Sequence, residues 1–291
     1  MRIKLMTGLT AVTLGTMAAV SPPAAAESRD GLPAIAPGTT VTPAIDCAPS
    51  AEHPYPVVVL PGGDGTVHET ADQWATIVDA LNAAGYCTLL FQGGVVNETR
   101  WAGDIPSGAR QLADFITEVR ETTGAERVDI VAHSAGTVVA NYFLKVLGGA
   151  PRVAHAVLLT PEARGCDGRG SLRQLGIDNL PVAPVEILRA LPILAPALAP
   201  SMGNALQLSP LSDVYHAVFD GPIAQPGVEY SVLSTRNDEV ATPATVCTVI
   251  DEPGVTMAFY EDRFPDAPAV GHSTIRSSAL TAGWILTRLT S

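Results

Sequence analysis

The stretch Arg127-Val128-Asp129-Ile130-Val131-Ala132-His133-Ser134-Ala135-Gly136 decides how this chain is expected to fold. Its first six residues have the composition of a short buried strand, and the helix-period segment 136–147 follows directly. A serine at the turn between a strand and a helix projects its hydroxyl clear of the sheet. Ala132 and Gly136, two residues before and two after it, are small, as such a tight turn requires. The sequence therefore predicts a strand–turn–helix unit with a projecting hydroxyl.

Short apolar runs alternate with helix-period segments on both sides of this unit. Strands are expected at 56–60, 86–91, 154–159, 228–234 and 255–260, and helices over 74–81, 105–124 and 275–289. Strands that alternate with helices in this way build parallel β-α-β units. The prediction is an α/β fold, in which helices flank a mostly parallel central sheet.

Between residues 161 and 226 this alternation stops. The segment is rich in proline, and loops of this length within a compact domain are usually lids or binding loops. We expect a lid- or cap-like insertion whose apolar side chains contact a substrate; the alternative is that these side chains are ordinary core residues. The side chains in question are Leu191, Ile193, Leu194, Leu198, Met202, Leu206 and Leu208.

Composition and charge exclude several classes of protein. Of 291 residues, 47% are hydrophobic and 16% charged, a balance that a disordered chain does not have. Lys and Arg total 17 against 29 Asp and Glu, which gives a formal net charge of -12. Binding to nucleic acid needs a basic surface that neutralises phosphates, and the sequence has no basic stripe. We therefore expect no nucleic-acid partner.

Residues 1–26 have the organisation of a secretory signal peptide. Arg2 and Lys4 precede an apolar stretch, and Ala24-Ala25-Ala26 forms a cleavage site. The alternative, a membrane anchor, is disfavoured because an apolar stretch of about 16 residues is short for a bilayer. The expectation is export with cleavage near Ala26, a flexible lead-in over 27–44, one domain over 45–291 and no stable membrane anchor.

Four cysteines occur in the chain, and an even number suits disulfides in an exported protein. Three pairings are possible, of which we favour Cys47 with Cys87 and Cys166 with Cys247. A metal site is the alternative, but the sequence has no pair of cysteines at C-x-x-C spacing. We expect no metal.

A serine hydroxyl becomes a nucleophile when a histidine takes its proton and a carboxylate orients that histidine. Of the six histidines, only His272 follows the last expected strand, in a glycine-flanked loop that opens the final helix. Asp238 follows the strand before it, with Glu239 as the near rival and Asp213 and Asp266 as distant ones. The order Ser134, Asp238, His272 suits a triad on this kind of turn. The alternative reading of Ser134 is a helix N-cap.

The oxyanion of such a reaction needs N–H donors aimed at it. The amide of Ala135 follows the serine, and the turn Pro61-Gly62-Gly63 after the first core strand offers Gly63 as the second donor. Gly62 and His133 are expected to contact substrate. A phosphate-binding loop is the alternative for these glycines, but the G-x-x-x-x-G-K pattern is absent.

The motifs together resemble the lipase class 2 group of secreted bacterial α/β-hydrolases. The resemblance covers about 45–291 and is weakest in 161–226. It is carried by 47–62, 85–87, 128–136, 141–150, 234–243 and 271–272. Pro61 stands where the family usually has histidine, which is similar to fungal lipase B enzymes, and Ala132 replaces the first glycine of G-x-S-x-G.

This resemblance implies an ester hydrolase that acts on acylglycerols or related lipid esters, with Ser134, Asp238 and His272 as its triad. We expect it to need no cofactor and to be a monomer. Three other functions stay open: an exported acyltransferase with the same triad, a peptidase, and a catalytically silent binding protein on the same fold.

Overall fold

The computed structural model describes residues 34–174, 176–177, 180–191, 194 and 204–290. The predicted signal peptide lies outside these residues, as do Ile193, Leu198 and Met202 of the insertion.

Six strands form one sheet in the order β3-β2-β5-β6-β7-β8. All five neighbouring pairs are parallel, so the predicted parallel sheet is confirmed. The strands are β2 (Val57–Leu60), β3 (Thr88–Leu90), β5 (Val128–His133), β6 (Val153–Leu159), β7 (Glu229–Ser234) and β8 (Val255–Phe259).

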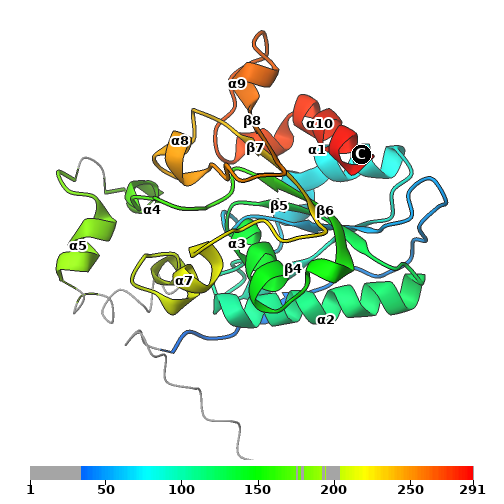
Figure 1. Cartoon of the computed structure of the whole chain (residues 1–291), viewed down its shortest axis with the longest axis horizontal. Helices are drawn as coiled ribbons and strands as arrows, with labels where there is room; N and C mark the ends of the chain where they lie inside the picture. Colours follow the sequence, from blue (N-terminus) through cyan, green and yellow to red (C-terminus); the bar gives the residue numbers. More distant parts are fainter. Residues whose placement is uncertain (1–33, 175, 178–179, 192–193, 195–203, 291) are drawn as a thin grey trace, which may run out of the picture.

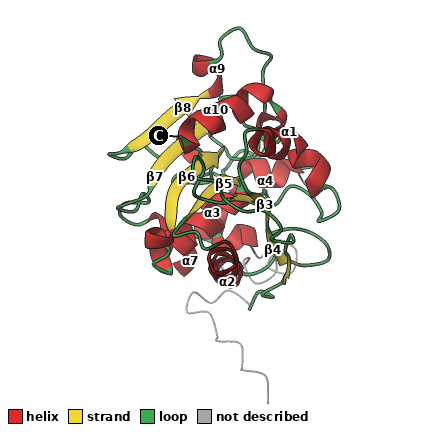
Figure 2. Ribbon diagram, turned by 90° about the vertical axis from the view of Figure 1, so that its right-hand side faces the viewer, coloured by secondary structure: helices red, strands yellow, loops and turns green. Residues whose placement is uncertain are grey.

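Helices cover both faces of this sheet, as Figures 1 and 2 show. On one face lie α1 (Thr70–Ala83) and α10 (Ala279–Leu289); on the other lie α2 (Ile105–Thr123), α3 (Ala135–Asn141) and α7 (Asp213–Phe219). Side chains of β2 alternate between the two resulting cores: Val57 and Val59 pack toward α1, and Val58 and Leu60 toward α2. Burial on both faces explains why β2, Val57–Leu60, is apolar without interruption.

Local sequence sets the ends of α2. The Asp104 side chain accepts a hydrogen bond from the Ser107 amide at its start. Gly124, with φ 72°, ends the helix in the left-handed region that glycine tolerates. The predicted helix over 136–147 consists of α3 followed by a π-helical turn, Tyr142–Val146.

Near the N-terminus the structure contains two strands that the sequence does not predict. Beyond β3 the chain enters β4 (Gln92–Val95), which pairs with β1 (Thr39–Val41) in a separate antiparallel ribbon. Three residues of the predicted lead-in, Thr39–Val41, thus form a strand. β4 contains Gly93 and Gly94, and glycine is uncommon in strands, so its sequence does not predict a strand. Glycine is required at position 93 because a Cβ there would lie 2.7 Å from the Trp101 ring.

The segment 161–226 is less irregular than expected. It contains α4 (Arg169–Gln174), α5 (Pro184–Ala190) and α7, each too short to show a helical period in the sequence. In Figure 1, α4 and α5 lie beyond one end of the sheet. Other short helices in the described part of the chain include α8 (Ala244–Cys247), α9 (Tyr260–Arg263) and two 3-10 turns, Ala150–Arg152 and Thr274–Ser277.

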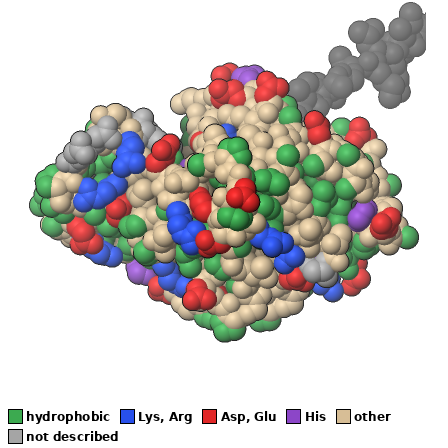
Figure 3. Space-filling view, turned by 90° about the horizontal axis from the view of Figure 1, so that it is seen from above, with side chains coloured by type: hydrophobic (Ala, Val, Ile, Leu, Met, Phe, Trp, Pro, Cys, Tyr) green, Lys and Arg blue, Asp and Glu red, His purple; other side chains and the backbone are tan. Residues whose placement is uncertain are grey.

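The favoured disulfide pairing is present. Cys47 is bonded to Cys87 and Cys166 to Cys247. In the face of the molecule that Figure 3 shows, Lys and Arg side chains are interspersed with Asp and Glu rather than gathered in one basic patch. Within the described part of the chain, no helix has the length and hydropathy that crossing a membrane requires.

Candidate active site

The predicted serine turn lies at the carboxyl end of β5, between β2 and β6. Ser134 adopts φ 51° and ψ -129°, a strained conformation for a residue with a Cβ. Gly136 must be small, because a Cβ there would lie 2.6 Å from the Pro61 carbonyl oxygen. Because α3 approaches the end of β2 this closely, the chain turns sharply at Ser134 between β5 and α3. This turn directs the serine hydroxyl away from the sheet.

Three side chains from distant parts of the chain form one hydrogen-bonded series here. The Ser134 hydroxyl lies 2.8 Å from Nε2 of His272, and Nδ1 of His272 lies 2.7 Å from Oδ2 of Asp238. A carboxylate only accepts, so Nδ1 carries the proton and Nε2 is left to accept from the serine. The three residues are 5%, 2% and 6% exposed, so little water competes for these bonds.

The loop after β7 binds the Asp238 oxygen that does not face His272. Its Oδ1 accepts hydrogen bonds from the amides of Val240 at 2.9 Å and Ala241 at 2.8 Å. The loop is fastened in turn to the start of the insertion, because Thr242 donates to Asp167 at 2.6 Å. Glu239, the near rival in the sequence, is exposed and belongs to no such series.

The two predicted oxyanion donors also converge. A Cβ placed on Gly63 would lie 3.6 Å from that of Ala135. Behind the loop, the Gly62 carbonyl accepts a hydrogen bond from Nε of Arg100 at 3.0 Å, and in a trans peptide this directs the Gly63 N–H the opposite way. Among the described residues, none accepts from the N–H of Gly63 or Ala135.

A network of charged residues lies behind these loops, and the sequence does not predict it. Oδ2 of Asp64 accepts from Ser273 and from Arg276, each at 2.5 Å, and its Oδ1 lies 3.5 Å from the fully buried Arg100. Asp64 thus joins the Gly63 turn to the loop that carries His272. The feature of the sequence that could indicate this network is the acidic residue inside the glycine-rich turn Gly62–Gly65.

Two predicted substrate contacts are wrong. His133 is fully buried, and its Nε2 lies 2.8 Å from the His272 carbonyl oxygen, to which it donates. Burial, with the neighbouring His272 charge, lowers the pKa of His133 to about 3, so the ring is neutral. Gly62 is buried against it, and a Cβ there would lie 2.6 Å from the ring Nδ1. Both residues position the histidine loop and the glycine turn instead.

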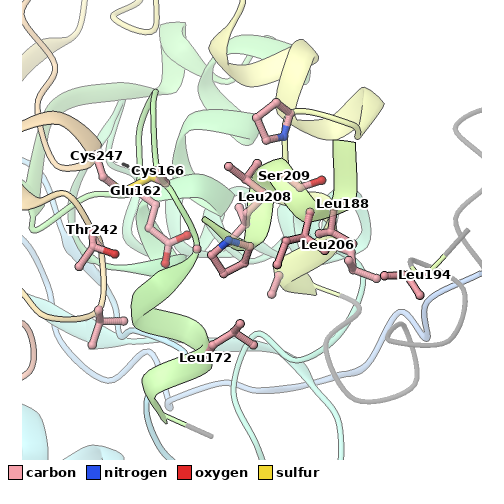
Figure 4. Close-up of a pocket in the computed structure, with 18 residues that line it drawn as sticks. Glu162, Cys166, Leu172, Leu188, Leu194, Leu206, Leu208, Ser209, Thr242 and Cys247 are labelled. Carbon is pink, nitrogen blue, oxygen red and sulfur yellow. Dashed lines mark hydrogen bonds between the residues drawn. A yellow bond between two sulfur atoms is a disulfide. The ribbon is translucent and has the colours of Figure 1, made fainter. Parts of the chain in front are cut away.

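A cavity of about 950 Å³, including its open mouth, lies between the insertion and the segment after β7 (Figure 4). Leu194, Leu206 and Leu208, three of the side chains expected to contact substrate, line it. Leu191 does not: it is 52% exposed and points to solvent. The other apolar lining residues are Leu172, Pro184, Val185, Ile187, Leu188, Ala205, Pro210, Val240 and Ala241.

The Asp64 network makes a testable contribution to stability. Burial opposes ionisation of Asp64, but the charges on His133 and Arg276 and the bonds from Ser273 and Arg276 hold its pKa far below the usual range. Because His133 is neutral above about pH 3, Arg276 and Ser273 carry this effect at neutral pH. A lowered folded-state pKa gives stability that is present above the unfolded value of about 3.9 and is lost as the pH falls below it.

We expect Asp64→Asn to lower the free energy of unfolding at pH 7 by about 3–5 kcal/mol, because it leaves Arg100 and Arg276 without a counter-charge. The deficit should shrink as the pH falls below about 4, because the unfolded wild type then takes up a proton that the folded state still excludes from Asp64. Denaturant unfolding across this pH range measures both effects. Asp262→Asn removes an exposed acid that also pairs with an arginine, and should change little. Equal stability of Asp64→Asn and the wild type would contradict the assignment.

Comparisons with known proteins identify the family and the fold. The alpha/beta hydrolase fold family matches residues 55–253. Among solved structures, Aspergillus fumigatus lipase B has a TM-score of 0.60 at 13% identity, over 84% of this chain and 56% of its own. The chain thus spans little more than half the length of that lipase.

Two further structures match nearly their whole length. The mature form of a Bacillus licheniformis lipase has a TM-score of 0.55 at 14% identity, over 88% of this chain and 99% of its own. An alpha/beta hydrolase fold protein from Chitinophaga pinensis has a TM-score of 0.52 at 15% identity, over 87% and 98%. These likenesses concern the fold, while the family match spans more than half of the sequence. The protein therefore belongs to the alpha/beta hydrolase fold family.

Proposed function

We propose that the protein is an exported serine ester hydrolase of the lipase or esterase type, with Ser134, His272 and Asp238 as its catalytic triad. The observation that carries this proposal is the buried series of two hydrogen bonds from the Ser134 hydroxyl through His272 to Asp238. Two unpaired N–H groups lie beside the serine, where acyl transfer needs donors.

In the first half of the reaction, the Ser134 oxygen attacks the ester carbonyl carbon while Nε2 of His272 takes the hydroxyl proton. The carbonyl electrons move to the oxygen, which the Gly63 and Ala135 amides bind. The C–O bond to the alcohol then breaks, and the alcohol leaves with the proton from His272. Water repeats these steps on the acyl-enzyme and releases the acid.

Asp238 keeps the imidazole in the required tautomer and stabilises its cation. Its second oxygen is occupied by the Val240 and Ala241 amides, so the carboxylate cannot rotate away from His272. The base is held from behind as well, by the bond from His133 to the His272 carbonyl. These contacts pre-organise the site before substrate arrives.

The cavity between the insertion and the loop that carries Asp238 suits an aliphatic chain, because apolar side chains make up most of its wall. Esters of fatty acids, such as acylglycerols, are the substrate class that fits it, and lipases are among the proteins with similar folds. The insertion is fastened to the segment that leads into α2: Asn204 donates to the Trp101 carbonyl at 2.7 Å, and Gln207 donates to Asp104 at 2.8 Å. We infer that it caps the acyl pocket.

Export fits the two disulfides, since such bonds persist in oxidising compartments. The experiment that tests the function uses the purified mature chain. We expect hydrolysis of nitrophenyl esters with a preference for one acyl length, and labelling of Ser134 by a serine-reactive phosphonate. Release of free acid in the presence of competing alcohols or sugars separates a hydrolase from an acyltransferase. An absence of both turnover and labelling would contradict the proposal.

Chain-length preference offers a sharper test of the cavity. Leu188→Trp should fill part of it and lower kcat/KM for long acyl chains on the order of tenfold relative to acetate, because an added ring removes room for several methylenes. Leu191→Trp is the matched control, since Leu191 lies outside the cavity. An unchanged length profile in Leu188→Trp would show that acyl chains bind elsewhere.

A further inference from the structure

One charged side chain stands in the wall of the apolar cavity. Among the described lining residues, Glu162 alone carries an ionisable group. Figure 4 shows its carboxyl pointing into the space that the apolar lining residues surround. A carboxyl group in such surroundings is costly unless something pairs with it.

The structure supplies no partner for this carboxyl. None of the described residues hydrogen-bonds to it or forms an ion pair with it. Burial raises the pKa of Glu162; the nearby His272 lowers it, and Asp238 raises it further. Part of the residue remains accessible because it faces the cavity rather than packed protein. The group is thus free to bind whatever enters.

The position of Glu162 relates it to the reacting atoms. It lies three residues beyond β6, the strand between β5, which leads to Ser134, and β7, which leads to Asp238. The carboxyl ends of these parallel strands meet at one edge of the sheet. Val240 and Ala241, whose amides bind Asp238, line the same cavity as Glu162. The cavity wall that carries Glu162 is thus continuous with the loop that holds the triad acid.

A hydroxyl is the group that suits this carboxyl best. It donates to an ionised carboxylate and accepts from a protonated carboxylic acid, so it pairs with either form. An ammonium group would pair only with the ionised form and would itself lose hydration among the leucines. An unsubstituted alkyl chain would cover the carboxyl and leave it without a hydrogen bond.

We propose that Glu162 selects esters whose acyl chain carries a hydroxyl close to the carbonyl, by a hydrogen bond to that hydroxyl inside the cavity. This inference rests on the proposed ester hydrolase function and narrows its substrate class from plain fatty esters to hydroxy-acyl esters. Glu162 is therefore a specificity-determining residue and does not take part in the proton transfers.

The test compares nitrophenyl esters of octanoic acid with those of its hydroxy derivatives, the hydroxyl placed at successive carbons. The wild type should prefer one hydroxy isomer over octanoate by about 10- to 100-fold in kcat/KM, as a site built to bind a hydroxyl does. Glu162→Leu should bring this ratio close to one, mainly by speeding octanoate hydrolysis and slowing that of the hydroxy ester. Glu162→Gln retains a hydrogen-bonding group and should keep most of the preference.

A stability measurement accompanies the kinetics. Glu162→Leu replaces an unpartnered carboxyl by an apolar side chain of similar size, so its Tm should be equal to or above that of the wild type. Glu118 is an exposed acid on α2, and Glu118→Gln is the control for the loss of a carboxylate. It should change neither the Tm nor the ratio of kcat/KM between the hydroxy ester and octanoate. A lower Tm for Glu162→Leu would overturn the inference, because the carboxyl would then have a structural partner.

Acetate hydrolysis distinguishes the ways in which the inference can fail. Acetate is too short to reach along the cavity, so its turnover reports on the triad. If the wild type hydrolyses acetate yet shows no preference for any hydroxy isomer, this inference fails and the ester hydrolase function stands. If Glu162→Leu lowers acetate and hydroxy-ester turnover by the same factor, Glu162 acts through His272 and the inference also fails. If the wild type hydrolyses none of the esters, the proposed function fails.

Discussion

Replacing Ser134 with alanine should lower kcat for ester hydrolysis by about 10⁵- to 10⁶-fold, while KM changes little. The side chain contributes one hydrogen bond, to Nε2 of His272, and no acyl-enzyme can form without its oxygen. The oxyanion donors and the cavity remain, which accounts for the residual rate above that in water. Steady-state kinetics with a short nitrophenyl ester measure the loss, and mass spectrometry of the phosphonate-treated protein should find no label.

The alanine variant should fold like the wild type, because it keeps the Cβ and therefore the strained backbone at φ 51°. Ser134→Gly should unfold at higher denaturant concentration, since glycine relieves a strain of about 1–3 kcal/mol. Ser277→Ala, an exposed serine near the histidine loop, is the matched control and should keep full activity. Turnover by Ser134→Ala within tenfold of the wild type would exclude Ser134 as the nucleophile.

The positions of the strands and the parallel character of the sheet could be predicted because their signals are local. Each buried strand is rich in apolar residues, and α2 has both a cap at Asp104 and a terminating glycine at Gly124. The serine turn was evident for the same reason, since the strand, the small residues and the helix are adjacent in sequence. Topology then restricts the base to the last loop, which is how a residue 138 positions from Ser134 could be proposed as its partner.

The supporting residues could not be predicted because their partners are remote. Arg276 binds an aspartate 212 residues away, and no local pattern records such a pair. Arg100 follows the polar run Asn97-Glu98-Thr99, which is typical of an exposed loop, yet it is fully buried. The prediction for His133 is wrong because it relies on a neighbour in the sequence: adjacency to Ser134 suggests contact with substrate. Side chains alternate along β5, however, and this alternation directs the His133 ring beneath the histidine loop.

Replacing Asp238 with asparagine should lower kcat by about 10⁴-fold at neutral pH, and the reason lies in how the loop orients the new amide. The amides of Val240 and Ala241 both point at the position of Oδ1 and require an acceptor there. The asparagine oxygen must take that position, so its NH₂ group faces Nδ1 of His272. The imidazole then carries its proton on Nε2, where it cannot accept one from Ser134.

Glu239→Gln is the matched control for this prediction, because Glu239 is the neighbouring acid that the sequence alone left as a rival. Its side chain is exposed, so kcat should stay within about twofold of the wild type, a change equivalent to less than 1 kcal/mol. Both variants keep the backbone of the loop, which the Thr242–Asp167 bond and the Cys166–Cys247 disulfide hold in place. A large loss of kcat in Glu239→Gln, together with an active Asp238→Asn, would show that Glu239 and not Asp238 is the acid of the triad. The tautomer assigned to His272 would then also be wrong.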